Sequence, residues 1–231
     1  MEFAYIQKTS LVDYPDNICS TLFTIGCNFK CPFCYNKSLV LPEEFTNNPL
    51  TEEQVLSTLI KRKRFVSAVC ITGGEPTIHK GLYNFIKSLK QEEFLVKLDT
   101  NGTNSEVIKR LINEKLVDYI AMDIKNSFDN YPKASGLNIE LSDIKKTIEI
   151  INLSDIPHEF RTTVVPSIHT VEDIEEIGRW TGGDKFSIQN FKRTNTLIDQ
   201  TLENVVPFSK NELDMFKKTA EKYFKKVELK I

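Results

Sequence analysis

The amino-acid sequence predicts an α/β fold, a partial (βα)6 barrel that stays open on one side. β-rich apolar runs alternate with amphipathic, helix-like segments through all 231 residues. This alternation is typical of parallel strands joined by right-handed helical crossovers. Six such units are present, whereas a closed barrel of this type has eight. Because no linker-like or low-complexity stretch interrupts the pattern, residues 1–231 are predicted to form a single domain.

Each predicted strand is a short apolar run bounded by turn-forming residues. The six barrel strands are predicted at 18–25, 66–72, 94–98, 117–124, 159–165 and 185–191. An extended stretch at 3–6 precedes them, and a short run at 226–231 follows the last helix.

Helices are predicted between the strands. Three of them begin at capping-box pairs, in which Ser or Thr is followed three residues later by Glu or Gln. These pairs are Thr51 with Gln54, Thr103 with Glu106, and Ser209 with Glu212. Apolar residues at helical spacing predict three more helices, over 82–89, 144–151 and 171–180. The basic run 61–64 is interpreted as a helix end, where cations suit the helix dipole, and not as a polyanion site.

The charge of the chain is nearly balanced, with 30 Lys and Arg against 32 Asp and Glu. This balance favours neither a nucleic-acid nor a membrane partner. No apolar run approaches the roughly 18 residues of a membrane span, and the N-terminus lacks a signal-peptide pattern. We therefore expect a cytoplasmic protein.

The most informative motif is a CxxxCxxC triplet, Cys27, Cys31 and Cys34, directly after the first barrel strand. An odd total of five cysteines, three of them close together, indicates a metal site in a reducing compartment and not a disulfide framework. A four-iron cluster ordinarily takes one cysteine per iron, so three thiolates leave one iron open to another ligand. Zinc completed by a histidine is the alternative, but none of the three histidines lies at a short ligand spacing. Cys19 and Cys70 lie in predicted strands and are interpreted as buried core residues.

Polar motifs also follow the other predicted strands, at the edge where parallel barrels carry their chemistry. In strand order they are Thr72-Gly73-Gly74-Glu75-Pro76, Asp99-Thr100-Asn101-Gly102, Asp123 with Lys125, Arg161, and Gln189-Asn190. Their common position predicts one functional site at this end of the barrel.

The cysteine triplet, with Phe33 just before its last cysteine, and the Gly73-Gly74-Glu75-Pro76 motif together resemble radical S-adenosylmethionine (SAM) enzymes. The resemblance covers almost the whole chain, and it implies a TIM-like radical SAM barrel. Segments 8–15 and 26–36 resemble the longer type of anaerobic ribonucleoside-triphosphate reductase activating protein. Segments 99–102 and 122–125 resemble the pyruvate formate-lyase activating enzyme. Both belong to the activating enzymes of glycyl radical enzymes.

The resemblance implies an oxidoreductase with a [4Fe-4S] cluster and SAM as its cofactors. Cys27, Cys31 and Cys34 would hold three irons, and the amino and carboxylate groups of SAM would chelate the fourth. An electron from a flavodoxin or ferredoxin would then yield a 5′-deoxyadenosyl radical, which takes a hydrogen from a glycine of a partner protein. The implied partner is a glycyl radical enzyme, most closely anaerobic ribonucleoside-triphosphate reductase. The cofactors carry the difficult chemistry, so no catalytic side chain is expected beyond their ligands.

The resemblance also implies SAM contacts at the strand ends. Gly73 and Gly74 would let backbone carbonyls approach the SAM ammonium, and Glu75 would add a charge-assisted hydrogen bond. Asp123 and Lys125 share one face of a strand and are expected to bind polar parts of SAM. Asp123 paired structurally with a neighbouring cation is the alternative.

Arg161 is expected to bind the SAM carboxylate, because its guanidinium can do so through two hydrogen bonds. Phe33 and Tyr35 are expected to contact adenine. Thr100 is also expected to contact SAM. A monovalent cation near SAM is implied as well, with hard oxygen ligands from Asp99, Thr100 and Asp123.

Two other functions remain open. Segment 37–50 contains no cysteine, so a second cluster is not expected. A small-molecule radical SAM enzyme such as a 7-carboxy-7-deazaguanine synthase is one alternative, although Tyr35-Asn36 after the last cysteine favours an activating enzyme. A non-enzymatic zinc or electron-transfer protein is the other, and the strand-end motifs disfavour it.

Overall fold

The computed structural model describes residues 1–230, and its framework is one nine-stranded sheet in the order β3-β1-β2-β4-β5-β6-β7-β8-β9. The strands are β1 (Glu2–Ser10), β2 (Cys19–Thr24), β3 (Leu50–Thr51), β4 (Ala68–Gly73), β5 (Leu95–Thr100), β6 (Tyr119–Asp123), β7 (His158–Val164), β8 (Gly183–Asn190) and β9 (Phe224–Lys230). From β2 to β9, without β3, neighbouring strands are parallel. The edge strands of this order, β3 and β9, are not paired with each other within residues 1–230, so the sheet is a barrel open on one side.

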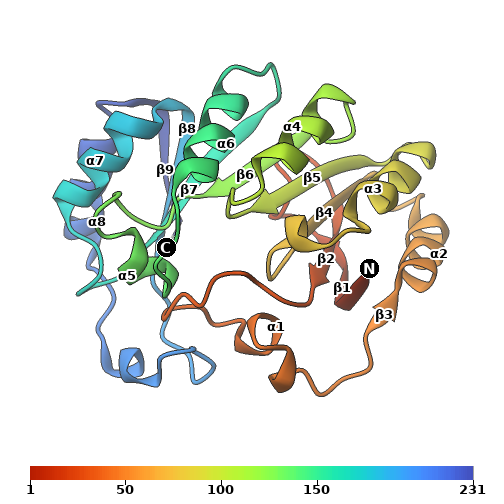
Figure 1. Ribbon diagram of the computed structural model, residues 1–231, viewed down its shortest axis with the longest axis horizontal. Helices are drawn as coiled ribbons and strands as arrows, with labels where there is room; N and C mark the ends of the chain where they lie inside the picture. Colours follow the sequence, from red (N-terminus) through yellow and green to blue (C-terminus); the bar gives the residue numbers. More distant parts are fainter. Residues whose placement is uncertain (231) are drawn as a thin grey trace.

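Six helices of nine to eleven residues connect the parallel strands and cover the outer face of the sheet (Figure 1). They are α2 (Glu52–Arg62), α3 (Leu82–Gln91), α4 (Ser105–Asn113), α6 (Ser142–Asn152), α7 (Val171–Thr181) and α8 (Lys210–Ala220). Shorter elements are α1 (Lys37–Val40), α5 (Tyr131–Ser135) and the 3-10 turns η1 (Pro42–Glu44), η2 (Pro76–Ile78) and η3 (Gln200–Asn204). No helix within residues 1–230 has the length and apolar character to cross a bilayer.

The α/β class and the six predicted parallel strands are confirmed, and the two ends of the sheet are more extensive than predicted. The N-terminal stretch is a nine-residue strand, β1, which runs antiparallel to β2 and β3. The C-terminal run is β9, a seventh parallel strand beside β8. Residue 231, at the end of that predicted run, lies outside the described residues.

Two of the three predicted capping boxes are present. Thr51 with Gln54 opens α2, and Ser209 with Glu212 opens α8. The predicted start of α4 at Thr103 was wrong, because Asn104 caps this helix by accepting a hydrogen bond from the backbone N–H of Val107. The Thr103 hydroxyl instead donates to the Asn101 side chain, so it is engaged in the preceding turn.

Alternation along each strand separates an apolar outer face from a more polar inner face. In β4, Val69 and Ile71 pack in the main core with the helices, whereas Cys70 faces inward. Cys19 and Cys70 are fully buried, as predicted, in a small cluster that closes the amino-terminal end of the barrel. Tyr14 completes this cluster from the loop after β1, with its ring 6.0 Å from that of Tyr119.

Candidate functional site

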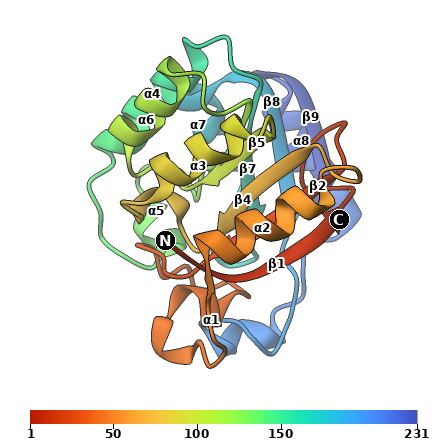
Figure 2. The ribbon, with the colours of Figure 1, turned by 90° about the vertical axis from the view of Figure 1, so that its right-hand side faces the viewer.

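The cysteine loop, residues 25–36, crosses the carboxyl end of the barrel and is held by three other segments, two of which are distant in sequence. Its backbone hydrogen bonds run from Gly26 N to Leu39 O (2.6 Å), Lys30 N to Ser135 O (2.9 Å), Ile198 N to Cys34 O (3.1 Å) and Asp199 N to Pro32 O (2.9 Å). Figure 2 shows α1 and the blue segment that follows β8 together at this end of the molecule. The shape of the loop therefore depends on parts of the chain far away in sequence.

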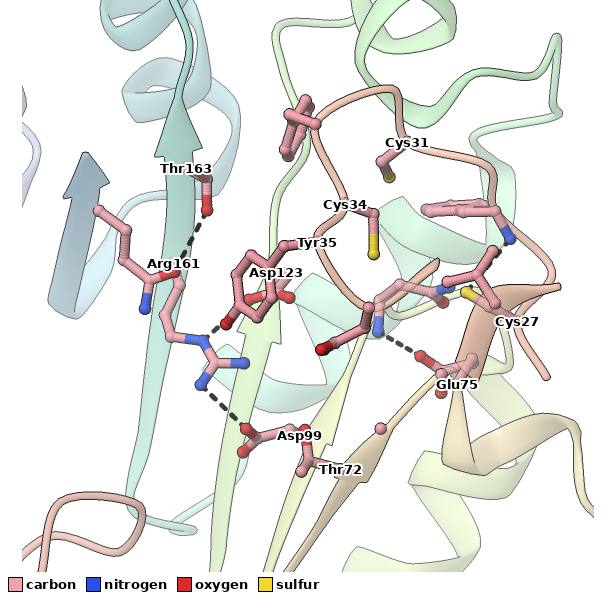
Figure 3. A pocket seen from close by; sticks show the side chains of 18 of the residues that line it. Cys27, Cys31, Cys34, Tyr35, Thr72, Glu75, Asp99, Asp123, Arg161 and Thr163 are labelled. Atoms are coloured by element: carbon pink, nitrogen blue, oxygen red, sulfur yellow. Dashed lines mark hydrogen bonds and ion pairs between the residues drawn. The ribbon is translucent and has the colours of Figure 1, made fainter. Parts of the chain in front are cut away.

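The three cysteines of the triplet line one cavity of about 550 Å³, and their sulfur atoms lie around a common space (Figure 3). All three are free thiols. Burial raises the pKa of Cys27 to about 12 and that of Cys31 to about 11, and it also raises the pKa of Cys34. Such thiols stay neutral until a metal ion compensates the charge of the thiolate. The donor set thus suits soft metal centres such as iron–sulfur clusters.

The two glycines after β4 bring this strand against the start of the cysteine loop. A Cβ atom on Gly74 would lie 1.8 Å from the Gly26 carbonyl oxygen, and one on Gly73 would lie 2.3 Å from Thr24 N. Gly74 N donates to Thr24 O and Glu75 N donates to Gly26 O, at 3.0 and 2.8 Å. The absence of side chains therefore serves a close approach between two strand ends, which the sequence analysis did not foresee.

Glu75 is 1% exposed, and hydrogen bonds from its own turn and from the loop after β5 reach its carboxylate. Oε1 accepts from Thr77 N (3.0 Å), Thr77 Oγ1 (2.5 Å) and Thr100 Oγ1 (2.8 Å), and Oε2 accepts from Asn101 N (2.7 Å). The expected hydrogen bond from Glu75 to SAM stays a prediction, and in this structure the carboxylate accepts hydrogen bonds from within the protein. Glu75 connects the ends of β4 and β5, and it engages the Thr100 hydroxyl in the same contact.

Arg161 lies between two carboxylates at the centre of the inner face (Figure 3). Its Nε donates to Asp123 Oδ1 at 2.8 Å, and Nη1 donates to Asp99 Oδ2 at 3.0 Å. Lys125 Nζ donates to the other oxygen of Asp123 at 3.1 Å. The structural pairing of Asp123 is therefore present, and the third nitrogen of Arg161, Nη2, lies outside both of these pairs.

This charged row keeps its members ionised. Burial alone would raise the pKa of Asp99 and Asp123, but the positive charges around them together outweigh it and lower both values: Arg161 with Lys97 for Asp99, and Arg161 with Lys125 for Asp123. Burial alone would lower the pKa of Lys125, and the Asp123 carboxylate instead raises it. The inner face therefore presents fixed charges of both signs.

The sequence analysis missed Lys97, which lies on the same inner face of β5 as Asp99. Lys97 is 2% exposed and forms an ion pair with Asp99 Oδ1, and its Nζ is 3.7 Å from the Cys70 sulfur. Its signal in the sequence is the alternation Val96-Lys97-Leu98-Asp99, which puts a lysine on the inward positions of a buried strand.

The two predicted aromatic contacts differ in position. Phe33 is buried and lies edge-on to His169, with 6.1 Å between the ring centres. His169 Nδ1 accepts from Val165 N and its Nε2 lies 2.7 Å from Lys125 O, so His169 supports the loop structurally. Tyr35 is 57% exposed and lines the cavity.

At the end of β8 the amide side chains also reach the cavity. Gln189 accepts a hydrogen bond from Thr163 Oγ1 at 3.2 Å, and Asn190 Nδ2 donates to Phe208 O at 2.8 Å. The structure thus brings the predicted strand-end residues together at one cavity, with Glu75 and Thr100 turned toward each other.

Comparison with known proteins identifies the class. Residues 21–181 match the radical SAM superfamily. A protein of Methanocaldococcus jannaschii described as a putative glycyl-radical enzyme activating enzyme is 35% identical over 228 residues, which cover 96% of this chain and 92% of that protein. A second protein of that organism with the same description is 28% identical over 185 residues. The chain belongs to the radical SAM superfamily.

Solved structures show the same fold. SuiB of Streptococcus suis bound to S-adenosylmethionine has a TM-score of 0.70 and 16% identity, over 90% of this chain and 49% of that one. The coproporphyrinogen III oxidase HemN of Escherichia coli has a TM-score of 0.61 and 13% identity, over 91% and 53% of the two chains. This chain thus spans about half the length of those two structures.

Membership of this family implies a [4Fe-4S] cluster and SAM, and the site fits both. Three free thiols line one cavity, Cys31 buried and the other two partly buried, and this donor set matches a cluster with three protein ligands. The zinc alternative is set aside by the family match. The monovalent cation fits less well, because all four carboxylate oxygens of Asp99 and Asp123 have positively charged partners.

Proposed function

We propose that this protein is a radical SAM activating enzyme that generates a glycyl radical on a partner enzyme, most closely anaerobic ribonucleoside-triphosphate reductase. The observation that carries the proposal is the 35% identity to a relative of that description over nearly the full length of both chains. An alignment that covers 96% of this chain extends far beyond the cluster motif.

Cys27, Cys31 and Cys34 would hold the cluster, and the strand ends around the cavity would hold SAM. When bound, the two cofactors supply reductive cleavage of SAM to a 5′-deoxyadenosyl radical that abstracts a hydrogen atom. Arg161 and Lys125 provide positive charge for the SAM carboxylate, and Asp99 and Asp123 fix the position of the guanidinium. Tyr35 and the edge of Phe33 border the space proposed for adenine.

The open side of the barrel supports a large substrate. The cavity is lined by Lys230 from β9, an edge strand of the sheet, and by Tyr5 and Gln7 from β1, beyond the two residues of β1 that pair with the short edge strand β3. A loop of a folded protein partner would therefore have access to the site. A flavodoxin or ferredoxin is proposed as the electron donor.

Electron paramagnetic resonance after anaerobic mixing with SAM, a reductant and candidate glycyl radical enzymes tests the proposal. We expect a glycine-centred doublet on the anaerobic ribonucleotide reductase. Release of 5′-deoxyadenosine with no radical on any candidate protein would contradict the activating role.

A small-molecule reaction is the alternative outcome of the same experiment. A 7-carboxy-7-deazaguanine synthase of Clostridium acetobutylicum is 27% identical over 194 residues, which cover 77% of this chain. This relative is more distant and aligns with less of the chain than the first. Turnover of that synthase's substrate without a protein radical would favour this alternative.

A further inference from the structure

Lys97 is a buried positive charge on the inner face of the barrel. It lies on β5, two residues before Asp99, so both side chains point into the barrel. Burial alone would lower the pKa of Lys97, but Asp99 and Cys70 together outweigh it and raise this pKa, so the ammonium group stays charged. Burying an ammonium group is costly unless an opposite charge and hydrogen bonds compensate it, so its position here requires a reason.

The two carboxylates beside the proposed SAM site are fully paired within the protein. Asp99 has Lys97 at Oδ1 and Arg161 at Oδ2. Asp123 has Arg161 at Oδ1 and Lys125 at Oδ2. Two aspartates are thus paired with three positive side chains, those of Lys97, Lys125 and Arg161. This group therefore has one excess positive charge.

The third ligand expected for a monovalent cation is also engaged elsewhere. Thr100 follows Asp99 directly and is buried, and its hydroxyl donates to Glu75 Oε1 at 2.8 Å and accepts from Gly102 N at 3.1 Å. Since neighbouring side chains in a strand point to opposite faces, Asp99 and Thr100 diverge here. A free cation at this place would add a further positive charge to a group that already has an excess.

We propose that Lys97 is a built-in cation that replaces the monovalent metal ion at the Asp99 carboxylate, so that this protein binds SAM without needing potassium or sodium. An ammonium group is a compact point charge, and as part of the chain it does not dissociate at low salt. Lys97 is a positioning residue: it holds Asp99, and Asp99 holds the Arg161 guanidinium. The proposal rests on SAM binding at this cavity, not on the identity of the partner protein.

The test measures SAM binding by equilibrium dialysis to the anaerobically reconstituted protein with its cluster oxidised, so that SAM is not consumed. The buffers contain about 0.1 M potassium, ammonium or tetramethylammonium chloride, which equalises charge screening. Lys97→Ala opens space for a small cation, whereas Lys97→Met fills that space with an apolar chain. Lys90→Ala is the control, because Lys90 also pairs with an aspartate, Asp118 at 2.7 Å, but Asp118, unlike Asp99, does not line the cavity.

We expect the unmodified protein and Lys90→Ala to bind SAM equally well in all three salts. Lys97→Ala should bind about tenfold more weakly in tetramethylammonium, since an unpaired Asp99 no longer holds Arg161, and should recover in potassium or ammonium. Lys97→Met should stay weak in every salt. A merely structural lysine would not produce a recovery that depends on cation size.

Three results would overturn the proposal. They are a saturable potassium requirement in the unmodified protein, unchanged affinity in Lys97→Ala, and a weakened Lys97→Ala that no small cation restores. Thermal unfolding of each variant without SAM shows whether it is folded, and Lys97→Arg retains a positive charge if both other variants fail to fold. Failure of the proposed activating role would leave this binding experiment intact.

Discussion

At the scale of single residues, Glu75 shows why an acidic side chain is needed in a fully buried position. Backbone and hydroxyl donors from Thr77, Thr100 and Asn101 converge on its carboxylate. Burial raises the pKa of Glu75, and these donors act in the opposite direction. A carboxylate accepts all of these bonds, whereas an amide presents a donor on one side.

Glu75→Gln should therefore destabilise the fold by about 2 kcal/mol, because its amide NH2 would face a backbone N–H with no acceptor. Chemical denaturation followed by circular dichroism measures this loss. Glu106→Gln, an exposed change in the first turn of α4, is the control and should have little effect. Equal stability of the two variants would contradict the role assigned to Glu75.

Cys31→Ala should abolish SAM cleavage and leave a folded protein, since it removes one proposed iron ligand from a loop that several backbone hydrogen bonds hold. Anaerobic iron analysis and 5′-deoxyadenosine release are the measurements. Cys19→Ala, at the closed end of the barrel, is the matched control and should retain cleavage. Cleavage by Cys31→Ala would remove this thiolate from the cluster.

The residues of the site differ in how far local sequence predicts them. The cysteine triplet and the strand-end motifs are contiguous, so spacing alone placed them at one end of the barrel. Glu75 bonds to Thr100 and Asn101 at the end of the next strand, and Arg161 bonds to carboxylates on two other strands, so these contacts depend on how the strands lie beside one another. Local sequence therefore did not show that Glu75 joins the ends of β4 and β5. Lys97 and Asp99 lie on one strand, so the alternation of that strand could have revealed their pairing.

At the scale of elements, the end of β4 and the cysteine loop fit together through backbone contact. Gly74→Ala would place a Cβ 1.8 Å from the Gly26 carbonyl oxygen. Because this oxygen is a backbone atom, the cysteine loop would have to shift to relieve the clash. We expect this variant to take up cluster poorly, measured by iron content and visible absorption. Gly182→Ala is the control, because its Cβ would meet nothing closer than 3.9 Å and only its backbone conformation, φ 56° with ψ −167°, costs energy, about 1–3 kcal/mol.

If Gly74→Ala held as much cluster as Gly182→Ala, the close approach would not matter for the loop.

Element boundaries also depend on tertiary structure. Periodicity predicted the helices and the parallel strands. The N-cap of α4 is Asn104 and not Thr103, because the Thr103 hydroxyl is hydrogen-bonded to the Asn101 side chain. The extent of β9 was underestimated, since its pairing with β8 is long-range.

At the scale of the whole molecule, the barrel interior is held by ion pairs across strands β5, β6 and β7. The pKa values of Asp99 and Asp123 are lower in the folded protein than the ordinary 3.8. Their contribution to stability is therefore fully present above that value and is lost as the pH falls below it. The unfolding temperature should stay constant from neutral pH down to the pH range in which carboxyl groups ordinarily titrate, and it should fall steeply below that range.

Thermal unfolding as a function of pH tests this dependence. Asp99→Asn should be less stable by about 3 kcal/mol at neutral pH, because Lys97 and Arg161 lose their shared partner. Its stability should also fall less on acidification. If the unfolding temperatures of the unmodified protein and Asp99→Asn fell equally on acidification, Asp99 would not be the cause of the acid sensitivity.

The hydrogen bonds from Ile198 and Asp199 to the cysteine loop have a consequence for when the protein can acquire its cluster during synthesis. Translation produces the three cysteines early, but the segment that completes their support emerges more than 160 residues later. We expect stable iron binding to wait until residues 198 and 199 have been made, so that a nascent chain stalled before residue 196 binds iron poorly while the released chain binds it well. Cluster insertion would then report that this segment has folded against the cysteine loop.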